Sequence, residues 1–86
     1  MNKIAVVGSG YVGLVTGTCF AETGNQVVCI DIDTQKVEKL RNGVVPIYEP
    51  ELETLFHRNI KANRLSFTNS LEEGIADAEI IFLALP

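Results

Sequence analysis

Short apolar runs alternate along the chain with longer segments in which apolar residues recur at helical spacing. The apolar runs lie at residues 3–7, 26–30, 65–68 and 79–85, and their composition suits parallel β-strands that helices cover on both faces. Each intervening segment is long enough to carry a helix back across the sheet, and the segment before the third strand is long enough for two. The pattern therefore predicts an α/β protein with a doubly wound parallel sheet and the strand order 3-2-1-4.

The first helix is predicted over residues 11–23, and Gly24 is a suitable residue to end it. Gly17 inside this helix costs about 1 kcal/mol relative to alanine, so its presence indicates a close approach between the helix and a strand. The apolar stripe that should face the core is formed by Val12, Val15, Cys19 and Phe20.

Asp33 is placed to cap a second helix that runs to Arg41. Ile32 and Val37 have the spacing of a hydrophobic staple, in which two apolar side chains pack on each other across the start of a helix. Val37 and Leu40 should face the core, while the lysine and glutamate side chains of this segment face solvent.

Two prolines bound the next stretch, in which residues 44–50 read Val-Val-Pro-Ile-Tyr-Glu-Pro. Pro50 suits the first position of a further helix, and Glu51 and Glu53 suit the positive end of its dipole. The apolar face of that helix should consist of Leu52, Leu55, Phe56 and Ile60.

The last apolar run, residues 79–85, reads as a strand buried on both faces, preceded by a short helix with Ser70 and Glu73 as its capping box. A buried strand normally has both edges paired or covered, because an open apolar edge promotes aggregation. We therefore expect the chain to be a fragment of a longer protein.

The first strand runs into Gly8-Ser9-Gly10-Tyr11-Val12-Gly13, which has the G-x-G-x-x-G spacing of a Rossmann dinucleotide-binding turn. Gly8 permits the tight turn, Gly10 lets a pyrophosphate approach the backbone, and Gly13 lets the helix pack closely. The N–H groups at the start of the helix attract phosphate oxygens. Tyr11 has two interpretations, contact with the ligand or packing.

An acidic residue, Asp31, follows the second strand at the spacing expected for the residue that accepts hydrogen bonds from the adenosine ribose. A carboxylate at this place repels a 2′-phosphate and favours NAD over NADP. The alternative for Asp31 is a helix cap, but Asp33 is better placed for that role. Lys36 is either a solvated helix residue or a contact of the adenosine.

The formal net charge of −4 argues against binding to nucleic acid or to an anionic membrane surface. The apolar runs are far shorter than the roughly 20 residues that span a bilayer, and the first ten residues predict no signal peptide. Two cysteines, Cys19 and Cys29, are too few for a disulfide framework. We expect both thiols to be buried in a reducing, cytoplasmic protein.

Candidate catalytic chemistry is sparse. His57 is expected to lie on a solvated helix face, and its surroundings in the sequence predict no metal site. The acidic residues near Pro50, including Glu49, are more typical of a helix start than of catalysis. We therefore expect a chain that binds a cofactor and contains neither a catalytic residue nor a metal ligand.

Three segments together resemble the N-terminal domain of the UDP-glucose/GDP-mannose dehydrogenase family, most closely its UDP-glucose members. They are residues 3–14, which contain the glycine motif, residues 31–37, which begin Asp-Ile-Asp, and Pro46-Ile47-Tyr48-Glu49-Pro50-Glu51-Leu52. The resemblance covers essentially the whole chain. Glu51 departs from the glycine of many members, which should affect only the start of the helix.

The resemblance implies an NAD-dependent oxidoreductase that oxidises the C6 hydroxymethyl of a nucleotide sugar to a uronate by two hydride transfers, in polysaccharide biosynthesis. It implies that residues 1–86 are the N-terminal part of the NAD-binding Rossmann domain, with the catalytic and substrate domains outside this chain. The full-length protein should be a homo-oligomer. Positions matching NAD contacts include Val12, Asp31 and Lys36, and Leu85 and Pro86 match the start of a loop below the nicotinamide ribose.

Two other functions remain open at this level. The chain could belong to another NAD-dependent dehydrogenase with a similar opening, although residues 46–52 argue against this. It could also be a non-catalytic nucleotide-sensing Rossmann module, which suits the short length but does not explain the extra helix or the final strand.

Overall fold

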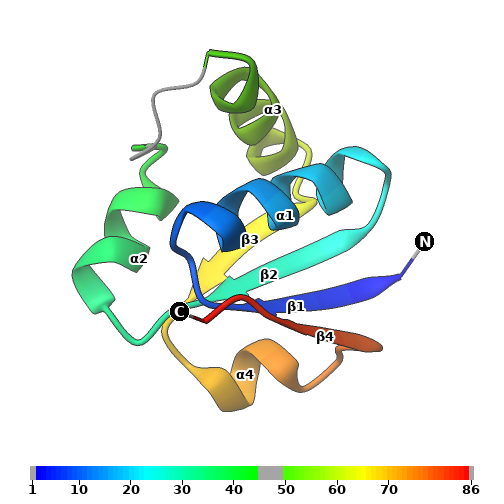
Figure 1. Cartoon of the computed structure of the whole chain (residues 1–86), viewed down its shortest axis with the longest axis vertical. Coiled ribbons are helices and arrows are strands. Elements are labelled where there is room, and N and C mark those ends of the chain that lie inside the picture. Colours follow the sequence, from blue (N-terminus) through cyan, green and yellow to red (C-terminus); the bar gives the residue numbers. More distant parts are fainter. Residues whose placement is uncertain (1, 45–49, 86) are drawn as a thin grey trace.

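Four parallel strands form a sheet with the order β3-β2-β1-β4 (Figure 1). The computed structural model describes residues 2–44 and 50–85. Its elements are β1 (Lys3–Val7), α1 (Tyr11–Glu22), β2 (Gln26–Ile30), α2 (Thr34–Arg41), α3 (Pro50–Lys61), β3 (Leu65–Thr68), α4 (Leu71–Ile75) and β4 (Ile80–Leu83). The predicted fold class and strand order are confirmed.

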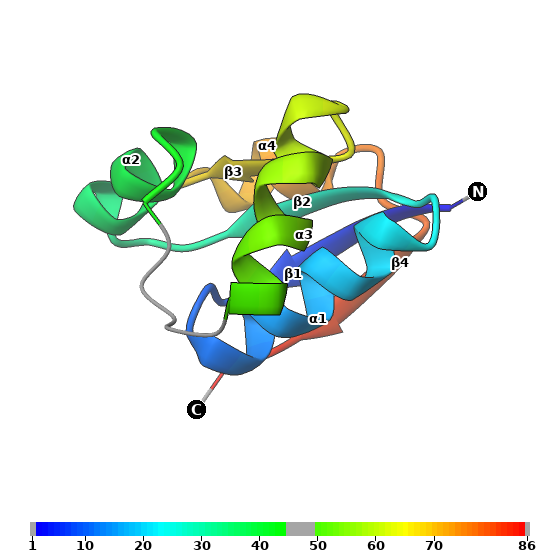
Figure 2. The same ribbon diagram turned by 90° about the horizontal axis from the view of Figure 1, so that it is seen from above.

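Helices α1 and α3 cover one face of the sheet, and α4 packs on the other (Figures 1 and 2). The chain therefore crosses to the opposite face between β3 and β4, and β4 lies on the free side of β1. The strand ends are level, since Val7 pairs with Ile30 of β2 and with Leu83 of β4. This register brings the segments that follow β1, β2 and β4 to one edge, at the switch point where doubly wound sheets bind ligands.

The predicted core stripe of α1 is wrong at Val12 and Cys19, although Phe20 packs against the core as expected and Val15 is half-buried. Val12 is 60% exposed and Cys19 is also exposed, whereas Gly13, Leu14, Gly17, Thr18 and Ala21 are buried. The helix presents mainly its small residues to the sheet because it lies very close to it: a Cβ on Gly17 would be only 2.8 Å from the sulfur of Cys29. The close approach predicted from Gly17 is thus confirmed, and that approach decides which face is buried.

Three local predictions have mixed outcomes. The Asp33 carboxylate accepts hydrogen bonds from the N–H groups of Gln35 and Lys36, which confirms it as the cap of α2. The predicted staple does not form, because Ile32 is 92% exposed. Cys29 is buried as expected, and burial raises the pKa of its thiol to about 12, but Cys19 lies on the solvent side of α1.

Helix α3 turns its predicted apolar face toward the core. Leu52 and Phe56 are buried, and the ring of Phe56 packs on that of Phe67 at 5.6 Å between centroids. Pro46 and Tyr48 belong to residues 45–49, which lie outside the described residues. Pro50 begins the helix, as predicted.

A polar residue that the pattern does not reveal fixes α3 to the rest of the fold. Asn59 is fully buried, and its amide donates to the Glu22 carboxylate at the end of α1, at 3.0 Å, and to the Leu55 carbonyl. Its carbonyl accepts from Arg64, which also donates to the Ala21 carbonyl. These bonds satisfy the buried amide and tie α1, α3 and the start of β3 together.

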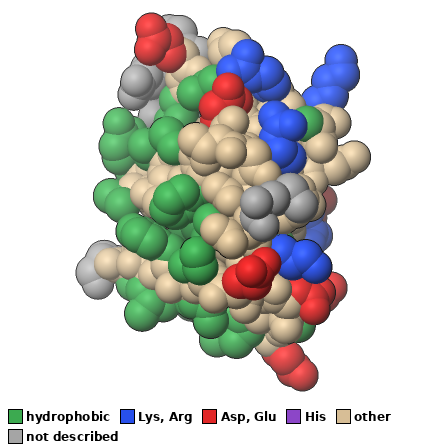
Figure 3. Space-filling model, turned by 90° about the vertical axis from the view of Figure 1, so that its right-hand side faces the viewer, with side chains coloured by type: hydrophobic (Ala, Val, Ile, Leu, Met, Phe, Trp, Pro, Cys, Tyr) green, Lys and Arg blue, Asp and Glu red, His purple; other side chains and the backbone are tan. Residues whose placement is uncertain are grey.

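The final strand is shorter and far more exposed than predicted. All four residues of β4 are exposed, from 39% for Phe82 to 68% for Leu83. The strand lies at the edge of the sheet, and in the described part of the chain its outer edge has no neighbouring strand. Figure 3 shows hydrophobic side chains gathered along one margin of the molecule. The short helix before β4 begins at the predicted cap, since Ser70 accepts from the Glu73 N–H.

Asn59→Ala should lower the free energy of unfolding by about 1–3 kcal/mol, because it removes the buried hydrogen bonds that join Asn59 to Glu22, Leu55 and Arg64. Arg58→Ala is the matched control on the same helix, since Arg58 pairs with Glu22 at the exposed surface and exposed pairs contribute little. Urea unfolding of both variants measures the difference. Equal losses would contradict the role assigned to Asn59.

Candidate dinucleotide site

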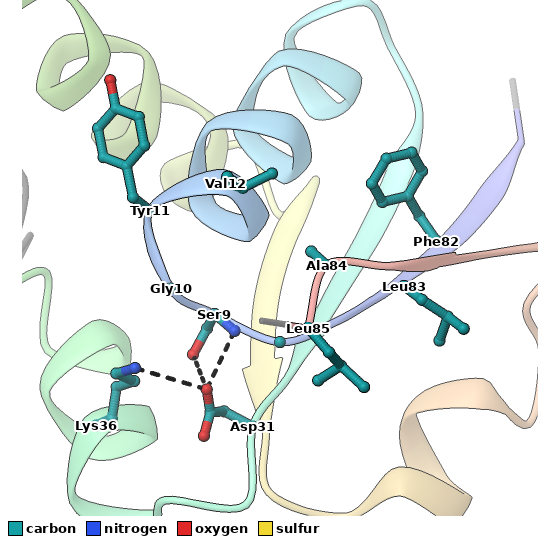
Figure 4. Close-up of a pocket in the computed structure, with 11 residues that line it drawn as sticks. Ser9, Gly10, Tyr11, Val12, Asp31, Lys36, Phe82, Leu83, Ala84 and Leu85 are labelled. Carbon is teal, nitrogen blue, oxygen red and sulfur yellow. Dashed lines mark hydrogen bonds and ion pairs between the residues drawn. The ribbon is translucent and has the colours of Figure 1, made fainter.

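A cleft of about 670 Å³ opens at the carboxyl edge of the sheet, between the segment after β1 and the end of β4 (Figure 4). Its volume is within the usual range of small-molecule sites. The residues that line it are Gly8, Ser9, Gly10, Tyr11, Val12, Asp31, Lys36, Phe82, Leu83, Ala84 and Leu85.

The glycine turn is held by backbone contacts. Gly8 has a φ of +106°, its N–H donates to the Ile30 carbonyl at 2.7 Å, and a Cβ on it would lie 2.7 Å from the Ala84 carbonyl oxygen. Gly13 is packed against the carbonyl group of Gly8 so closely that a Cβ would overlap it. The first and third glycines of the motif therefore let α1 start directly against the end of β1.

The middle glycine differs, because it faces open space. Gly10 is the N-cap of α1, and a Cβ on it would have no atom of the described chain within 4 Å. No side chain caps this end of α1 in the described structure. The first N–H groups of an α-helix have no acceptor within the helix and carry a partial positive charge. The start of α1 is therefore suited to an anionic group that approaches Gly10.

Asp31 lies beside this helix start, at the end of β2. One carboxylate oxygen, Oδ2, accepts from the Ser9 hydroxyl at 2.7 Å and from the Ser9 N–H at 3.1 Å (Figure 4). The other oxygen, Oδ1, accepts from the Asp33 N–H at 3.0 Å. Burial acts to raise the pKa of Asp31, but the hydrogen bonds from Asp33 and Ser9, with the charge of Lys36, outweigh it and lower the pKa below its usual value. Asp31 is therefore an ionised acceptor at neutral pH.

Lys36 supplies the cationic side chain of the cleft. It comes from the first turn of α2, and its Nζ lies 3.7 Å from Oδ2 of Asp31. Its side chain is 39% exposed, so solvent screens the pair and the interaction is weak. Lys36 was expected to be either a solvated helix residue or a contact of the adenosine. In the structure its side chain is partly solvated and also lines the cleft.

The structure brings together most of the residues that the sequence singled out: Gly8, Ser9, Gly10, Tyr11, Val12, Asp31, Lys36 and Leu85 all line the cleft. Gly13 lies beneath it, and Pro86 is outside the described residues. Sequence reasoning missed Phe82, Leu83 and Ala84, three apolar residues that also line the cleft. The predicted strand order could have identified these residues, because it places the end of β4 beside the end of β1.

Other candidate groups lie away from the cleft or do not cluster. His57 is exposed on α3, with Nε2 3.7 Å from the Glu53 carboxylate. Within residues 2–44 and 50–85, no group of three or more His, Cys, Asp and Glu side chains is arranged to hold a metal ion. Of the helices described, none has the length and apolarity needed to cross a membrane.

Comparison with known proteins agrees with this geometry. The model of the UDP-glucose/GDP-mannose dehydrogenase family, NAD binding domain, matches residues 2–86. A UDP-glucose 6-dehydrogenase of Bacillus subtilis is 56% identical over 85 residues, which are 99% of this chain and 18% of that protein. One from Pseudomonas aeruginosa is 54% identical over 83 residues, which are 96% of this chain and 18% of that protein.

Among solved structures, a UDP-glucose dehydrogenase from the archaeon Pyrobaculum islandicum superposes with a TM-score of 0.91 at 42% identity. The match covers 99% of this chain and 20% of that one. The chain thus spans about a fifth of the length of its relatives.

Gly13→Ala should destabilise the fold by several kcal/mol, because its Cβ has to displace the backbone of Gly8. Gly10→Ala is the matched control: Gly10 has a φ of −71° and open space around it, so the unfolding free energy should fall by no more than about 1 kcal/mol, the cost of alanine at an N-cap. Thermal unfolding of the two variants tests this. A Gly13→Ala variant as stable as Gly10→Ala would refute the packing argument.

Proposed function

Because the chain belongs to the UDP-glucose/GDP-mannose dehydrogenase family, as its NAD binding domain, we propose that it is the cofactor-binding part of an enzyme that oxidises UDP-glucose or a related sugar nucleotide. The C6 hydroxymethyl would take up the oxygen of one water and transfer two hydrides, one to each of two NAD molecules, to become a carboxylate. The observation that carries the proposal is the cleft in which an uncapped helix start and an ionised carboxylate lie side by side. The names of the relatives supply the substrate class.

Each part of the cleft has a role in this proposal. The backbone from Gly8 to Gly13 holds the pyrophosphate, with Gly10 leaving the space that the phosphates need. Asp31 accepts hydrogen bonds from the adenosine ribose, and Lys36 lies at the adenosine side of the cleft. The nicotinamide half would lie against the part of the cleft that Val12 and Leu85 line.

NAD, when bound, supplies the hydride acceptor. The chain's own residues bind and orient it: the backbone donors of the glycine turn fix the phosphates, and Asp31 fixes the ribose. We assign no catalytic residue to residues 1–86, which form the N-terminal part of the Rossmann domain in this proposal. The groups that act on the sugar belong to the remaining four fifths of a protein as long as the relatives.

The family match favours this function over a non-catalytic sensing module or an unrelated NAD-dependent dehydrogenase. We further propose that the full-length protein acts in the cytoplasm as a homo-oligomer. Its uronate product would serve polysaccharide biosynthesis.

The complete protein that carries these residues should reduce about two NAD per UDP-glucose consumed, because oxidation of an alcohol to a carboxylate removes two hydrides. Absorbance of NADH measures this, and NADP should be used at least about tenfold less well because Asp31 repels a 2′-phosphate. NAD binding without NADH formation from any UDP- or GDP-sugar would instead favour a sensing module.

Asp31→Ala should weaken NAD binding about tenfold or more, because hydrogen bonds to a charged group contribute about 1.5–3 kcal/mol. Asp33→Ala is the matched control: it removes the α2 cap but retains the backbone N–H that donates to Asp31. We expect it to cost about 1 kcal/mol of stability and to change the NAD dissociation constant less than about threefold. Calorimetric titration gives both constants, and equal effects would contradict the assignment of Asp31 to the ribose.

A further inference from the structure

The Ser9 side chain is buried at the junction of the glycine turn and β2, and it is directed at Asp31 (Figure 4). Only 1% of Ser9 is exposed. Its hydroxyl and its backbone N–H both donate to the same oxygen, Oδ2 of Asp31, at 2.7 and 3.1 Å. Ser9, the residue between the first two glycines of the motif, is therefore hydrogen-bonded to the carboxylate of Asp31 at the end of β2.

The direction of this hydrogen bond limits what Ser9 can do. An ionised carboxylate only accepts hydrogen bonds, and a serine hydroxyl has a single proton to donate. Since that proton goes to Asp31, it is not available to a phosphate oxygen, which is also an acceptor. The Ser9 side chain can therefore influence an anionic ligand only by acting on Asp31.

The carboxylate is held from both sides. The Asp33 N–H donates to Oδ1 at 3.0 Å, opposite the two Ser9 donors on Oδ2. Lys36 adds a longer contact of 3.7 Å from a partly exposed side chain, which solvent weakens. Because the strong donors are two backbone N–H groups and the Ser9 hydroxyl, the hydroxyl is the part of this arrangement that a side-chain substitution can remove.

We propose, resting on the function proposed above, that Ser9 is a positioning residue for cofactor specificity. It fixes the Asp31 carboxylate so that it accepts the ribose hydroxyls of NAD and repels the 2′-phosphate of NADP. A carboxylate released from this bond turns more freely, and both the attraction to NAD and the discrimination against NADP diminish.

The test is Ser9→Ala in the complete protein, a change that keeps the backbone N–H and the Cβ. Its dissociation constant for NAD should rise about three- to tenfold, a part of the effect of a hydrogen bond to a charged group, and its preference for NAD over NADP should fall.

The pH dependence of NAD binding should change as well. The bond from Ser9 helps to lower the pKa of Asp31, so in Ser9→Ala the loss of NAD binding on acidification should begin at a higher pH.

A double-mutant cycle separates action through Asp31 from direct contact. In an Asp31→Ala background, Ser9→Ala should change NAD affinity less than about twofold, because its partner is already gone. Ser70→Ala is the control for general destabilisation, since Ser70 caps α4 and lies outside the residues of the cleft. It should lower the thermal stability without altering NAD binding.

An equal loss of NAD affinity in both backgrounds would overturn the proposal, because it would mean that Ser9 contacts the cofactor itself. An unchanged affinity and pH profile in Ser9→Ala would overturn it too. If the unsubstituted protein fails to bind NAD, the proposed function is wrong, which is a different result from either of these.

Discussion

The contact between Gly8 and Gly13 is the constraint on which the site depends. With no Cβ on Gly13, the first turn of α1 lies directly on the Gly8 carbonyl, and Gly8 adopts a positive φ that other residues rarely take. This fixes the start of α1 a short distance from the end of β1. Because β1 and β2 end level, the same contact also places the helix start beside Asp31. The start of α1 and the Asp31 carboxylate, which we propose as the donors for an anion and the acceptor for a sugar hydroxyl, are thus both positioned by one backbone approach.

An acidic chain can hold an anionic dinucleotide because the attraction is local. The formal net charge is −4, and the cleft itself contains a carboxylate. The positive potential comes from the N–H groups at the start of α1 and from Lys36. The carboxylate is compatible with this because hydrogen bonds from Ser9 and Asp33, with Lys36 nearby, stabilise its negative charge.

The remaining elements serve mainly to keep this edge of the sheet in place. A chain of this size buries only about 60% of the surface that it exposes when unfolded, so individual contacts matter. The buried amide of Asn59 joins α3 to the end of α1, and Phe56 packs α3 against β3. In contrast, β4 contributes an apolar wall to the cleft while its side chains remain largely exposed.

The sequence alone determined the order of elements, the parallel sheet, the cap at Asp33 and the presence of a glycine turn and an acidic residue at the ends of the first two strands. These depend on short-range rules: apolar runs, capping residues and residues that tolerate unusual backbone geometry. The tertiary structure decided what depends on distance between elements. It turned the small residues of α1 inward and Val12 and Cys19 outward, because the helix lies too close to the sheet for larger side chains. It left Ile32 in solvent and β4 exposed at the sheet edge. It also joined Ser9 to Asp31, 22 positions apart, because only the level ends of two strands bring their side chains into contact.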